Sequence, residues 1–376
     1  MKPIQFIDLQ AQKDLIRPNI DNAIQRVLEH GEYIMGPEVL ELEQQLADFC
    51  NVKHVITCSN GTDALSLGLI AKNVEVGDAV FVPSFTFAAT AEVVALLGAT
   101  PVFIDSLPDT YNIDPESLLI GIQTAKKAGL KPVGIITVDL FGQPVDYDAI
   151  KDIAEQNSIW IIADAAQSFG ADYKGIKVGN FGDITTTSFF PAKPLGCYGD
   201  GGAVFTNDDE LAKVIKSLRV HGQGSDKYDN IRVGINGRLD TIQAAILLEK
   251  LKIFPEEIIA RQQAADTYNK ALETVVQIPY VPKDMASVWA QYTIQLPERV
   301  VREKIISDLK SVGIPSVIYY VKPLHQQTAY NKYLIVGNAL PVCEKLSKQV
   351  LSLPMSGYIT TEQVQYITKH LVSILK

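Results

Sequence analysis

The sequence has 376 residues, of which 34 are Lys or Arg and 43 are Asp or Glu, so its formal net charge is -9. This length allows two domains or one large domain with an appendage, and the composition is that of a soluble globular protein. The acidic balance argues against nucleic acid or an anionic membrane as the main partner, although a few local donors can still bind a small anion.

The start of the chain, MKPIQFIDLQAQKDL, lacks the charged-then-apolar pattern of a signal peptide. No apolar run approaches the roughly 18 residues that would suggest a membrane span. The four cysteines (Cys50, Cys58, Cys197 and Cys343) show no CxxC spacing, so we predict neither a disulfide framework nor a metal site. These features together predict a cytoplasmic protein.

From about Lys53 onward, short apolar runs alternate with helical stretches. We predict strands at residues 54–59, 78–84, 100–105, 133–142 and 158–171, and helices at residues 63–72, 90–99 and 147–157. Strands that are apolar throughout, rather than alternating, are typical of a parallel sheet covered on both faces. The succession therefore predicts an α/β fold with a large, mostly parallel sheet in a three-layer domain.

The pattern changes in the last third of the chain. Residues 238–272 read as a long helix interrupted near Pro255, followed by a strand at 289–296, a helix at 301–313 and another strand at 314–320. We predict a large domain at residues 1–253, whose first 30 or so residues form an N-terminal arm or helix. Residues 254–376 would form a smaller C-terminal α/β domain.

The first strand–helix junction, CSNGTDAL, is a candidate anion site. Gly61 and Thr62 would lie at the N-terminus of a helix that begins near Asp63, where unpaired N–H groups and the helix dipole favour a phosphate. The alternative is an ordinary helix cap, because Asn, Gly and Thr are common there. Neither GxGxxG nor GxxxxGK[ST] follows a predicted strand, so dinucleotide and Walker-type sites are not predicted.

The segment WIIADAAQSFGA places Asp164 at the carboxyl end of a buried strand, the edge where α/β proteins bind ligands. A buried carboxylate there needs a cation or several donors, since leaving it alone costs several kcal/mol or more. An Asp that caps the next helix is the alternative, with Gln167 closing the cap.

In SFFPAKPLGCYGDGG, Lys193 stands before Pro194, which biases it toward extended backbone, and Ser188 lies five residues upstream. A solvated lysine in a surface turn is the alternative interpretation. A lysine amine can, however, form a Schiff base with a carbonyl. Pyridoxal 5′-phosphate needs such a lysine, an acidic partner for its pyridine nitrogen and a phosphate site, and all three candidates occur here in order.

Six segments carry a resemblance to a known family: NGTDAL, GDAVFVPSFTFAAT, TYNID, DAAQSFGA, SFFPAKPLGCYGDGGAVFTND and GINGRLDTIQAAIL. Together they resemble the nucleotide-sugar aminotransferases of the DegT/StrS family, which are fold-type I pyridoxal-phosphate enzymes. The resemblance covers nearly the full length. The variant KPLGCYGDGG most resembles a subgroup that aminates C3 of UDP-2-acetamido-2-deoxy-3-oxo-D-glucuronate for bacterial surface polysaccharide, such as O-antigen.

The resemblance implies roles for the residues of the cofactor site. Lys193 would form the Schiff base and later move a proton, and Asp164 would keep the pyridine nitrogen protonated. Gln167 would lie near the phenolic oxygen of the ring. Phe87 would stack on the ring, although a core phenylalanine is an equal alternative. The phosphate would be bound by Gly61, Thr62 and Ser188.

The resemblance also implies substrate contacts and a homodimer with shared active sites. Asn236 and Arg238 match positions that reach the neighbouring subunit's site; Asn236 would contact the phosphate, and Arg238 would hold a carboxylate of the amino donor or of a uronic acid. A surface arginine in an ion pair at a helix start is the alternative. Tyr319 and Tyr320 match, more weakly, an aromatic pair near the nucleotide sugar. His325 resembles the histidine of a PLH segment, with a surface histidine as the alternative.

The predicted activity is transamination of a nucleotide-linked keto sugar with L-glutamate as amino donor. Alternatives are the same chemistry on a dTDP-linked 3-oxo or 4-oxo deoxyhexose, a PLP-binding regulatory protein without turnover, and a purely structural α/β protein. One departure from the family is Asp139 with Leu140, where many members have a histidine, which would bear on substrate fit.

Overall fold

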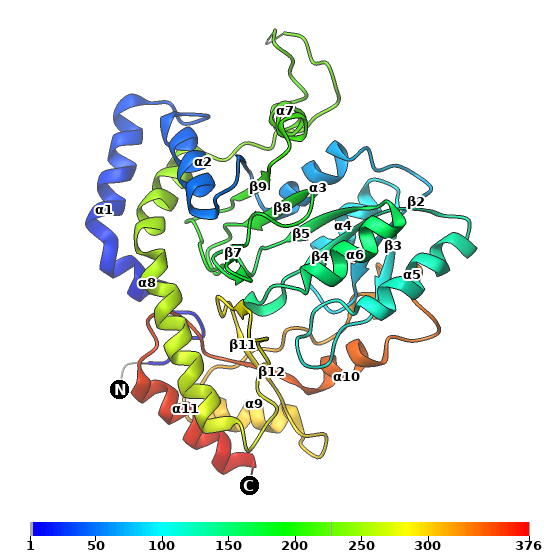
Figure 1. The fold of residues 1–376 in the computed structure, drawn as a ribbon. Coiled ribbons are helices and arrows are strands. Elements are labelled where there is room, and N and C mark those ends of the chain that lie inside the picture. The colour runs from blue at the N-terminus through cyan, green and yellow to red at the C-terminus, as the bar shows by residue number, and fades with distance from the viewer. Residues whose placement is uncertain (1–2, 227, 376) are drawn as a thin grey trace.

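The computed structural model describes residues 3–226 and 228–375, and its centre is a seven-stranded twisted sheet (Figure 1). The strand order is β1-β9-β8-β5-β4-β2-β3, in which β9 runs antiparallel to β1 and β8 while the other neighbouring pairs are parallel. The strands are β1 His54–Cys58, β2 Asp78–Pro83, β3 Thr100–Ile104, β4 Lys131–Val138, β5 Trp160–Asp164, β8 Ile184–Ser188 and β9 Gly202–Thr206. The predicted mostly parallel sheet is confirmed.

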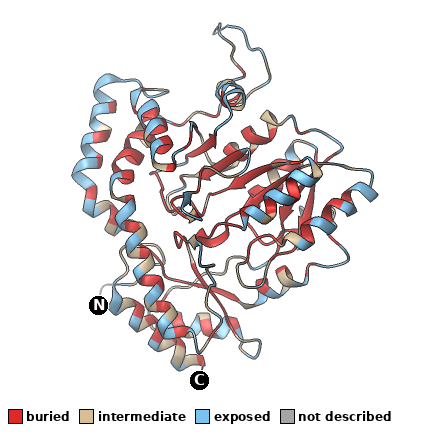
Figure 2. Cartoon of the chain, in the orientation of Figure 1, coloured by how far each residue is buried: buried red, intermediate tan, exposed pale blue. Residues whose placement is uncertain are grey.

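Helices cover both faces of this sheet, and their outward sides are exposed while the strands between them are buried (Figure 2). All residues of β2 and of β9 are buried, which explains why these segments are apolar runs without alternation. The helices of this domain are α2 Pro37–Cys50, α3 Gly61–Ala71, α4 Ala89–Leu96, α5 Pro115–Lys127, α6 Tyr147–Asn157 and α7 Asp209–Leu218.

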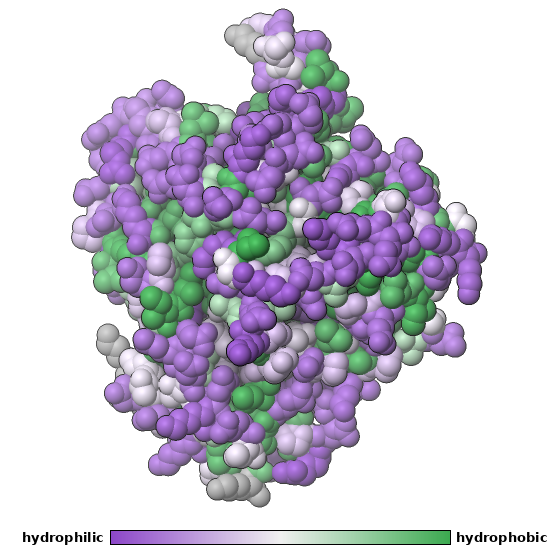
Figure 3. Space-filling view, viewed as in Figure 1, coloured by the Kyte–Doolittle hydropathy of each residue, from purple (hydrophilic) through white to green (hydrophobic). Residues whose placement is uncertain are grey.

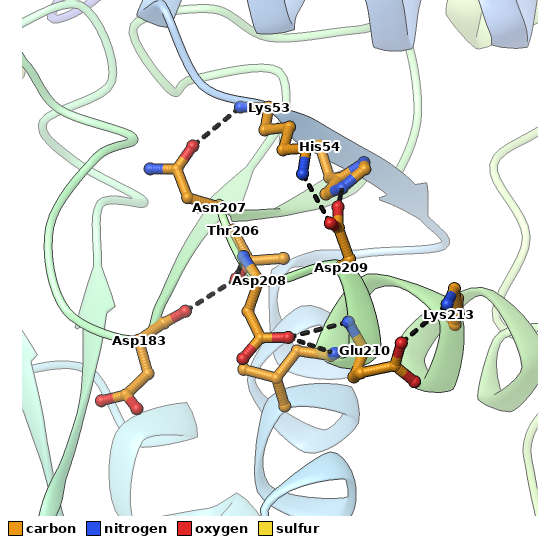
Figure 4. A network of polar contacts seen from close by, with 10 residues as sticks. Lys53, His54, Asp183, Thr206, Asn207, Asp208, Asp209, Glu210 and Lys213 are labelled. Carbon is orange, nitrogen blue, oxygen red and sulfur yellow. Dashed lines mark hydrogen bonds and ion pairs between the residues drawn. The ribbon is translucent and has the colours of Figure 1, made fainter.

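A network of polar contacts fixes the start of α7 to the amino end of β1 (Figure 4). Asp208 caps α7 by accepting from the backbone N–H groups of its first turn. Asp209 pairs with Lys53 and with His54 Nε2, and these bonds lower the pKa of Asp209 to about 2. Because β1 begins here, the network lies at the amino ends of the parallel strands, on the sheet edge opposite to their carboxyl ends.

The long helix α8, Thr241–Leu272, runs between the two parts of the chain (Figure 1). The interruption predicted near Pro255 is wrong: the helix continues through this proline. Proline inside a helix removes one hydrogen bond and costs about 3 kcal/mol, but Leu251 and Phe254 are buried in the core at this point, and their burial offsets the loss. The N-terminal helix α1, Leu9–His30, packs along α8 through Ile16, Ile20, Ala23 and Val27.

A smaller unit lies below the large sheet in Figure 1. It pairs β11 Tyr292–Gln295 with β12 Val350–Leu353, and its core joins α9 Arg302–Ser311, α11 Thr361–Leu375 and the second half of α8. The strand predicted at residues 314–320 is wrong. Only Val317 bridges to Ser352, because the chain then leaves the small sheet and turns toward the large one.

Part of the C-terminal region returns to the large sheet. Ile335 bridges to Phe103 of β3, and the short helix η2 Leu324–Gln326 and α10 Pro341–Gln349 contribute Leu324 and Leu346 to the core of the large domain. We propose that the boundary between the two domains lies between residues 253 and 254. Residues 324–349 of the smaller domain then cover the β3 edge of the large sheet. The remaining elements are η1 Leu140–Gly142, β6 Asp172–Tyr173, β7 Ile176–Lys177 and β10 Met285–Ala286.

None of the helices within residues 3–226 and 228–375 combines the length and the apolar character needed to cross a bilayer. In the same ranges, no group of three or more His, Cys, Asp or Glu side chains is arranged to hold a metal ion.

Candidate active site

The candidate residues meet at the carboxyl edge of the large sheet. β5 ends at Asp164 and β8 ends at Ser188, and these two strands are parallel neighbours. β1 ends two residues before Asn60, and β2 ends just before Ser84. Carboxyl ends of parallel strands form the edge where α/β proteins bind ligands, so the topology brings together segments that are distant in sequence.

The phosphate candidates are in contact. A methyl group on Gly61 would lie 2.6 Å from Cβ of Ser188, and one on Gly202 would collide with the carbonyl oxygen of Asn60. Only glycine therefore allows the start of α3 to approach the end of β8 so closely. The structure places Gly61, Thr62 and Ser188 around one helix N-terminus, a favourable position for an anion.

The cap at this junction is made by Asn60, whose Oδ1 accepts from the backbone N–H of Asp63 at 2.8 Å. The helix begins at Gly61, two residues earlier than predicted. The alternative interpretation of this junction as an ordinary helix cap is thus correct for Asn60. The Asn60 side chain bonds to the N–H of Asp63, however, and not to those of Gly61 and Thr62. These first N–H groups have no acceptor within the helix and remain available to a ligand.

Asp164 and Lys193 form the charged centre of the site. Asp164 is 8 % exposed, and its Oδ1 accepts from the backbone N–H of Ala166 at 3.0 Å. Burial raises the pKa of Asp164, against the N–H of Ala166 and the charge of Lys193, which lower it. Burial lowers the pKa of Lys193, against the charge of Asp164. Each residue thus feels the other's charge.

Lys193 lies on a closed loop rather than in a solvated turn. Its backbone N–H bonds to the carbonyl of Phe190, and the loop is closed by a bond from Phe189 N–H to the carbonyl of Gly201 at 2.7 Å. The Lys193 side chain is half-buried. Among residues 3–226 and 228–375, no hydrogen bond or ion pair engages its amine, which leaves the amine available for chemistry.

Gln167 connects the large sheet to Tyr320. Its Oε1 accepts from the backbone N–H of Phe141 at 2.9 Å, and its Nε2 donates to the hydroxyl of Tyr320 at 3.3 Å. The Tyr320 ring packs edge-on against Phe85, while Tyr319 contacts Phe6 of the N-terminal arm. The structure therefore brings Tyr320 into the site, next to a residue predicted to contact the cofactor.

Phe87 is 58 % exposed, so the alternative of a core phenylalanine is wrong. It lies in the loop between β2 and α4, whose neighbouring Phe85 is buried instead. An apolar ring left open beside the ends of the strands is suited to stack on a planar ligand.

His325 is only 9 % exposed, so the alternative of a surface histidine is also wrong. Its Nδ1 lies 2.7 Å from the hydroxyl of Ser84, and its Nε2 lies 3.3 Å from a carboxylate oxygen of Glu344. Both ring nitrogens therefore have partners within the chain. His325 therefore has no free ring nitrogen with which to make the predicted substrate contact.

Asn236 and Arg238 flank Gly237, whose carbonyl accepts from the backbone N–H of Ser59 at 3.1 Å. Asn236 is exposed, and Nε of Arg238 is buried without a partner in the described part of the chain. No ion pair of Arg238 occurs within residues 3–226 and 228–375, so the helix-start ion pair is not formed there. The segment lies beside the helix N-terminus of the phosphate candidates.

Two residues of this region were not predicted to belong to the site, although Asp139 was noted as a departure from the family. Asp139, directly after β4, is fully buried and accepts hydrogen bonds from Val145 N–H, the Tyr147 hydroxyl and the Ser168 hydroxyl. The signal that identified Asp164, an acidic residue after an apolar strand, could have found it. Lys250 is buried behind the Lys193 loop. Nothing in the sequence of this helix, which mixes apolar and charged residues, distinguishes Lys250 as a buried lysine.

A model of the DegT/DnrJ/EryC1/StrS aminotransferase family matches residues 14–372. The chain is 50 % identical, over 97 % of its length and 98 % of the relative's, to the UDP-2-acetamido-2-deoxy-3-oxo-D-glucuronate aminotransferase of Pseudomonas aeruginosa. A solved DegT/DnrJ/EryC1/StrS aminotransferase from Brucella abortus superposes with a TM-score of 0.97 at 51 % identity, covering 99 % of both chains. NtdA from Bacillus subtilis, solved with bound cofactor PMP, superposes with a TM-score of 0.86 at 30 % identity, covering 95 % of this chain and 81 % of that one.

Proposed function

Because the chain belongs to the DegT/DnrJ/EryC1/StrS aminotransferase family, we propose that it transfers an amino group from L-glutamate to C3 of UDP-2-acetamido-2-deoxy-3-oxo-D-glucuronate. It is a sugar aminotransferase of fold type I, and its cofactor is pyridoxal 5′-phosphate. The observation that carries the choice of sugar is the 50 % identity with the Pseudomonas aeruginosa enzyme over nearly the whole of both chains.

The site fits this cofactor. The close approach of Gly61 to Ser188 leaves N–H and hydroxyl donors for a phosphate, and Asp164 and Lys193 stand beyond it as the acidic and amine partners. Phe87 offers an open ring face. When bound, pyridoxal phosphate supplies an electron sink that stabilises negative charge at the carbon that loses its proton.

The two charged residues would divide the work. Lys193 would hold the cofactor covalently and, once released, carry the proton to and from the reacting carbon. Its pKa is lowered by burial, so a larger fraction of its amine is neutral and able to accept that proton. Asp164 would remain a carboxylate beside the pyridine N–H, since a cation there offsets the cost of its burial.

The substrate carboxylates would be held by Arg238. Its Nε has no hydrogen-bond partner within residues 3–226 and 228–375, and a guanidinium can bind a carboxylate through two parallel hydrogen bonds. Both L-glutamate and a uronic acid carry such a group, so a single residue would serve both halves of the reaction. Tyr319 and Tyr320 would line the sugar side, with Tyr320 held by Gln167.

The working unit would be a homodimer in which Asn236 and Arg238 of one subunit complete the partner's site. Residues 219–226 and 228–240, between α7 and α8, include a part that projects away from the body, and hydrophobic residues are visible on it (Figures 1 and 3). Ile231 is 56 % and Val233 is 92 % exposed there, an arrangement suited to a protein interface. We further propose a cytoplasmic enzyme of surface polysaccharide synthesis, in keeping with its four free cysteines.

Turnover with alternative sugars tests the proposal. The PLP-loaded enzyme would be given L-glutamate with the UDP-linked 3-oxo uronate, or with dTDP-linked 3-oxo and 4-oxo deoxyhexoses, and 2-oxoglutarate would be measured. We expect the uronate to be preferred. No activity on the uronate would refute the proposed sugar, and activity on a dTDP sugar would support the alternative. PLP binding without turnover of any sugar would indicate a regulatory protein.

A further inference from the structure

Ser84, the first residue after β2, is held through all of its polar groups. Its backbone N–H donates to the carbonyl of Ile104 at 3.0 Å, and its carbonyl accepts from Leu324 N–H at 2.8 Å. Its hydroxyl oxygen accepts from the backbone N–H of His325 at 3.2 Å and lies 2.7 Å from Nδ1 of the same residue. Ser84 is fully buried, so these bonds form away from solvent.

The network assigns the tautomer of His325. The Glu344 carboxylate of α10 can only accept, so Nε2 carries the ring proton and donates to it. In a neutral ring Nδ1 is then the unprotonated nitrogen and accepts from the Ser84 hydroxyl, whose oxygen also accepts from the His325 backbone N–H. Burial lowers the pKa of His325, which is consistent with a neutral ring.

The loop that begins at Ser84 carries Phe87, the residue proposed to stack on the cofactor. A single segment from the C-terminal half of the chain holds this loop at two points: His325 bonds to Ser84, and the Tyr320 ring packs against Phe85 at a centroid distance of 6.0 Å. The Phe87 ring is 58 % exposed, so packing of the ring itself does little to hold it in place. Its position depends on how the base of the loop is fixed.

We propose that His325 is a positioning residue, which holds the Phe87 loop against the cofactor through the bond from Ser84 to Nδ1, and that it does not bind substrate. The inference rests on the proposed role of Phe87 in cofactor stacking. A direct substrate contact would need a free ring nitrogen, whereas Nδ1 accepts from Ser84 and Nε2 donates to Glu344. The two nitrogens can be tested separately.

The test measures the dissociation constant of pyridoxal phosphate, without any sugar, for two variants. In His325→Asn the amide oxygen takes the place of Nδ1 and can still accept from Ser84. In His325→Gln the amide reaches toward Glu344 but leaves the Ser84 hydroxyl without its acceptor. We expect His325→Gln and Ser84→Ala to weaken cofactor binding about tenfold, from the loss of one buried hydrogen bond, and His325→Asn to stay within about twofold of the native protein.

A double-mutant cycle asks whether the effect passes through Phe87. Phe87→Leu removes the stacking ring, and adding His325→Gln to it should then cause no further loss of affinity. His54→Gln is the matched control, because His54 pairs with Asp209 at the opposite sheet edge, and it should leave cofactor binding unchanged. If His325→Gln does not fold, Ser84→Ala decides by the same criterion.

Equal losses in His325→Asn and His325→Gln would overturn the proposal, as would a loss that persists in full in the Phe87→Leu background. An effect confined to the KM for the nucleotide sugar would assign His325 to the substrate instead. Failure of the proposed sugar is a separate outcome, because cofactor affinity is measured in the absence of any sugar.

Discussion

The ammonium of Lys250 donates to the carbonyl oxygen of Gly196 at 2.6 Å and thereby ties α8 to the loop that carries Lys193. Lys250 is 1 % exposed, and its Nζ also lies 4.3 Å from the centre of the Tyr198 ring. Two turns earlier on α8, Gln243 accepts from the backbone N–H of Tyr198 at 2.8 Å. One face of the long helix thus holds the loop that carries Lys193.

Replacing Lys250 by Met is expected to loosen this loop. The change keeps the apolar stem but leaves the Gly196 carbonyl without its donor, a loss of about 1–3 kcal/mol that is partly offset because no ammonium is buried. We expect slower covalent attachment of pyridoxal phosphate to Lys193, measured by borohydride reduction and peptide mapping. Lys252→Met, an exposed position on the same helix, is the control and should behave as the native protein.

Asp139 is expected to make stability depend on pH. Burial raises the pKa of Asp139 to about 7, so between about pH 4 and 7 the unfolded chain has lost a proton that the folded protein retains. The contribution of Asp139 to the free energy of unfolding is therefore full below pH 4, and it declines by at most about 1.4 kcal/mol per pH unit as the pH rises to 7. Asp139→Asn should abolish this decline.

The measurement is thermal unfolding of both proteins from pH 4 to 8, with the difference in Tm as the readout. The difference in Tm between the native protein and Asp139→Asn should change between pH 4 and 7, as the native protein loses stability, and should level off above pH 7. A constant gap would mean that Asp139 is ionised throughout and that its three donors outweigh its burial.

Gly61→Ala is expected to open the phosphate cradle. The added methyl would lie 2.6 Å from Cβ of Ser188, so the start of α3 must move away from the end of β8. Movement of a few tenths of an ångström separates the donors of the phosphate, and we expect cofactor affinity to fall about tenfold or more. Equilibrium dialysis with pyridoxal phosphate measures this, and unchanged affinity would place the phosphate elsewhere.

The shared site can be tested by mixing two inactive subunits. Lys193→Ala and Arg238→Ala should each abolish turnover, yet the hybrid dimer would contain one site with the native Lys193 of one subunit and the native Arg238 of the other. We expect co-expressed, differently tagged subunits to recover activity. A hybrid as inactive as its parents would indicate that each chain completes its own site.

The sequence by itself determined the fold class and the chemical centre. Uninterrupted apolar strands that alternate with helices are typical of a covered parallel sheet, and an acidic residue at the end of such a strand needs a cation or several donors. Asp164, Lys193 and the start of α3 at Gly61 could therefore be predicted from local pattern together with the resemblance to a family. The expected break at Pro255 failed because burial of neighbouring side chains, a tertiary effect, outweighed a local rule.

Only the tertiary structure decided what surrounds that centre. The partners of His325 are 241 residues away at Ser84 and 19 residues away at Glu344, and the acceptor of Lys250 is 54 residues away at Gly196. Such contacts depend on which strand ends and helix faces the topology brings together, and no local spacing records them. A histidine that resembles a substrate ligand in sequence is, once folded, enclosed by two partners that leave it no free nitrogen.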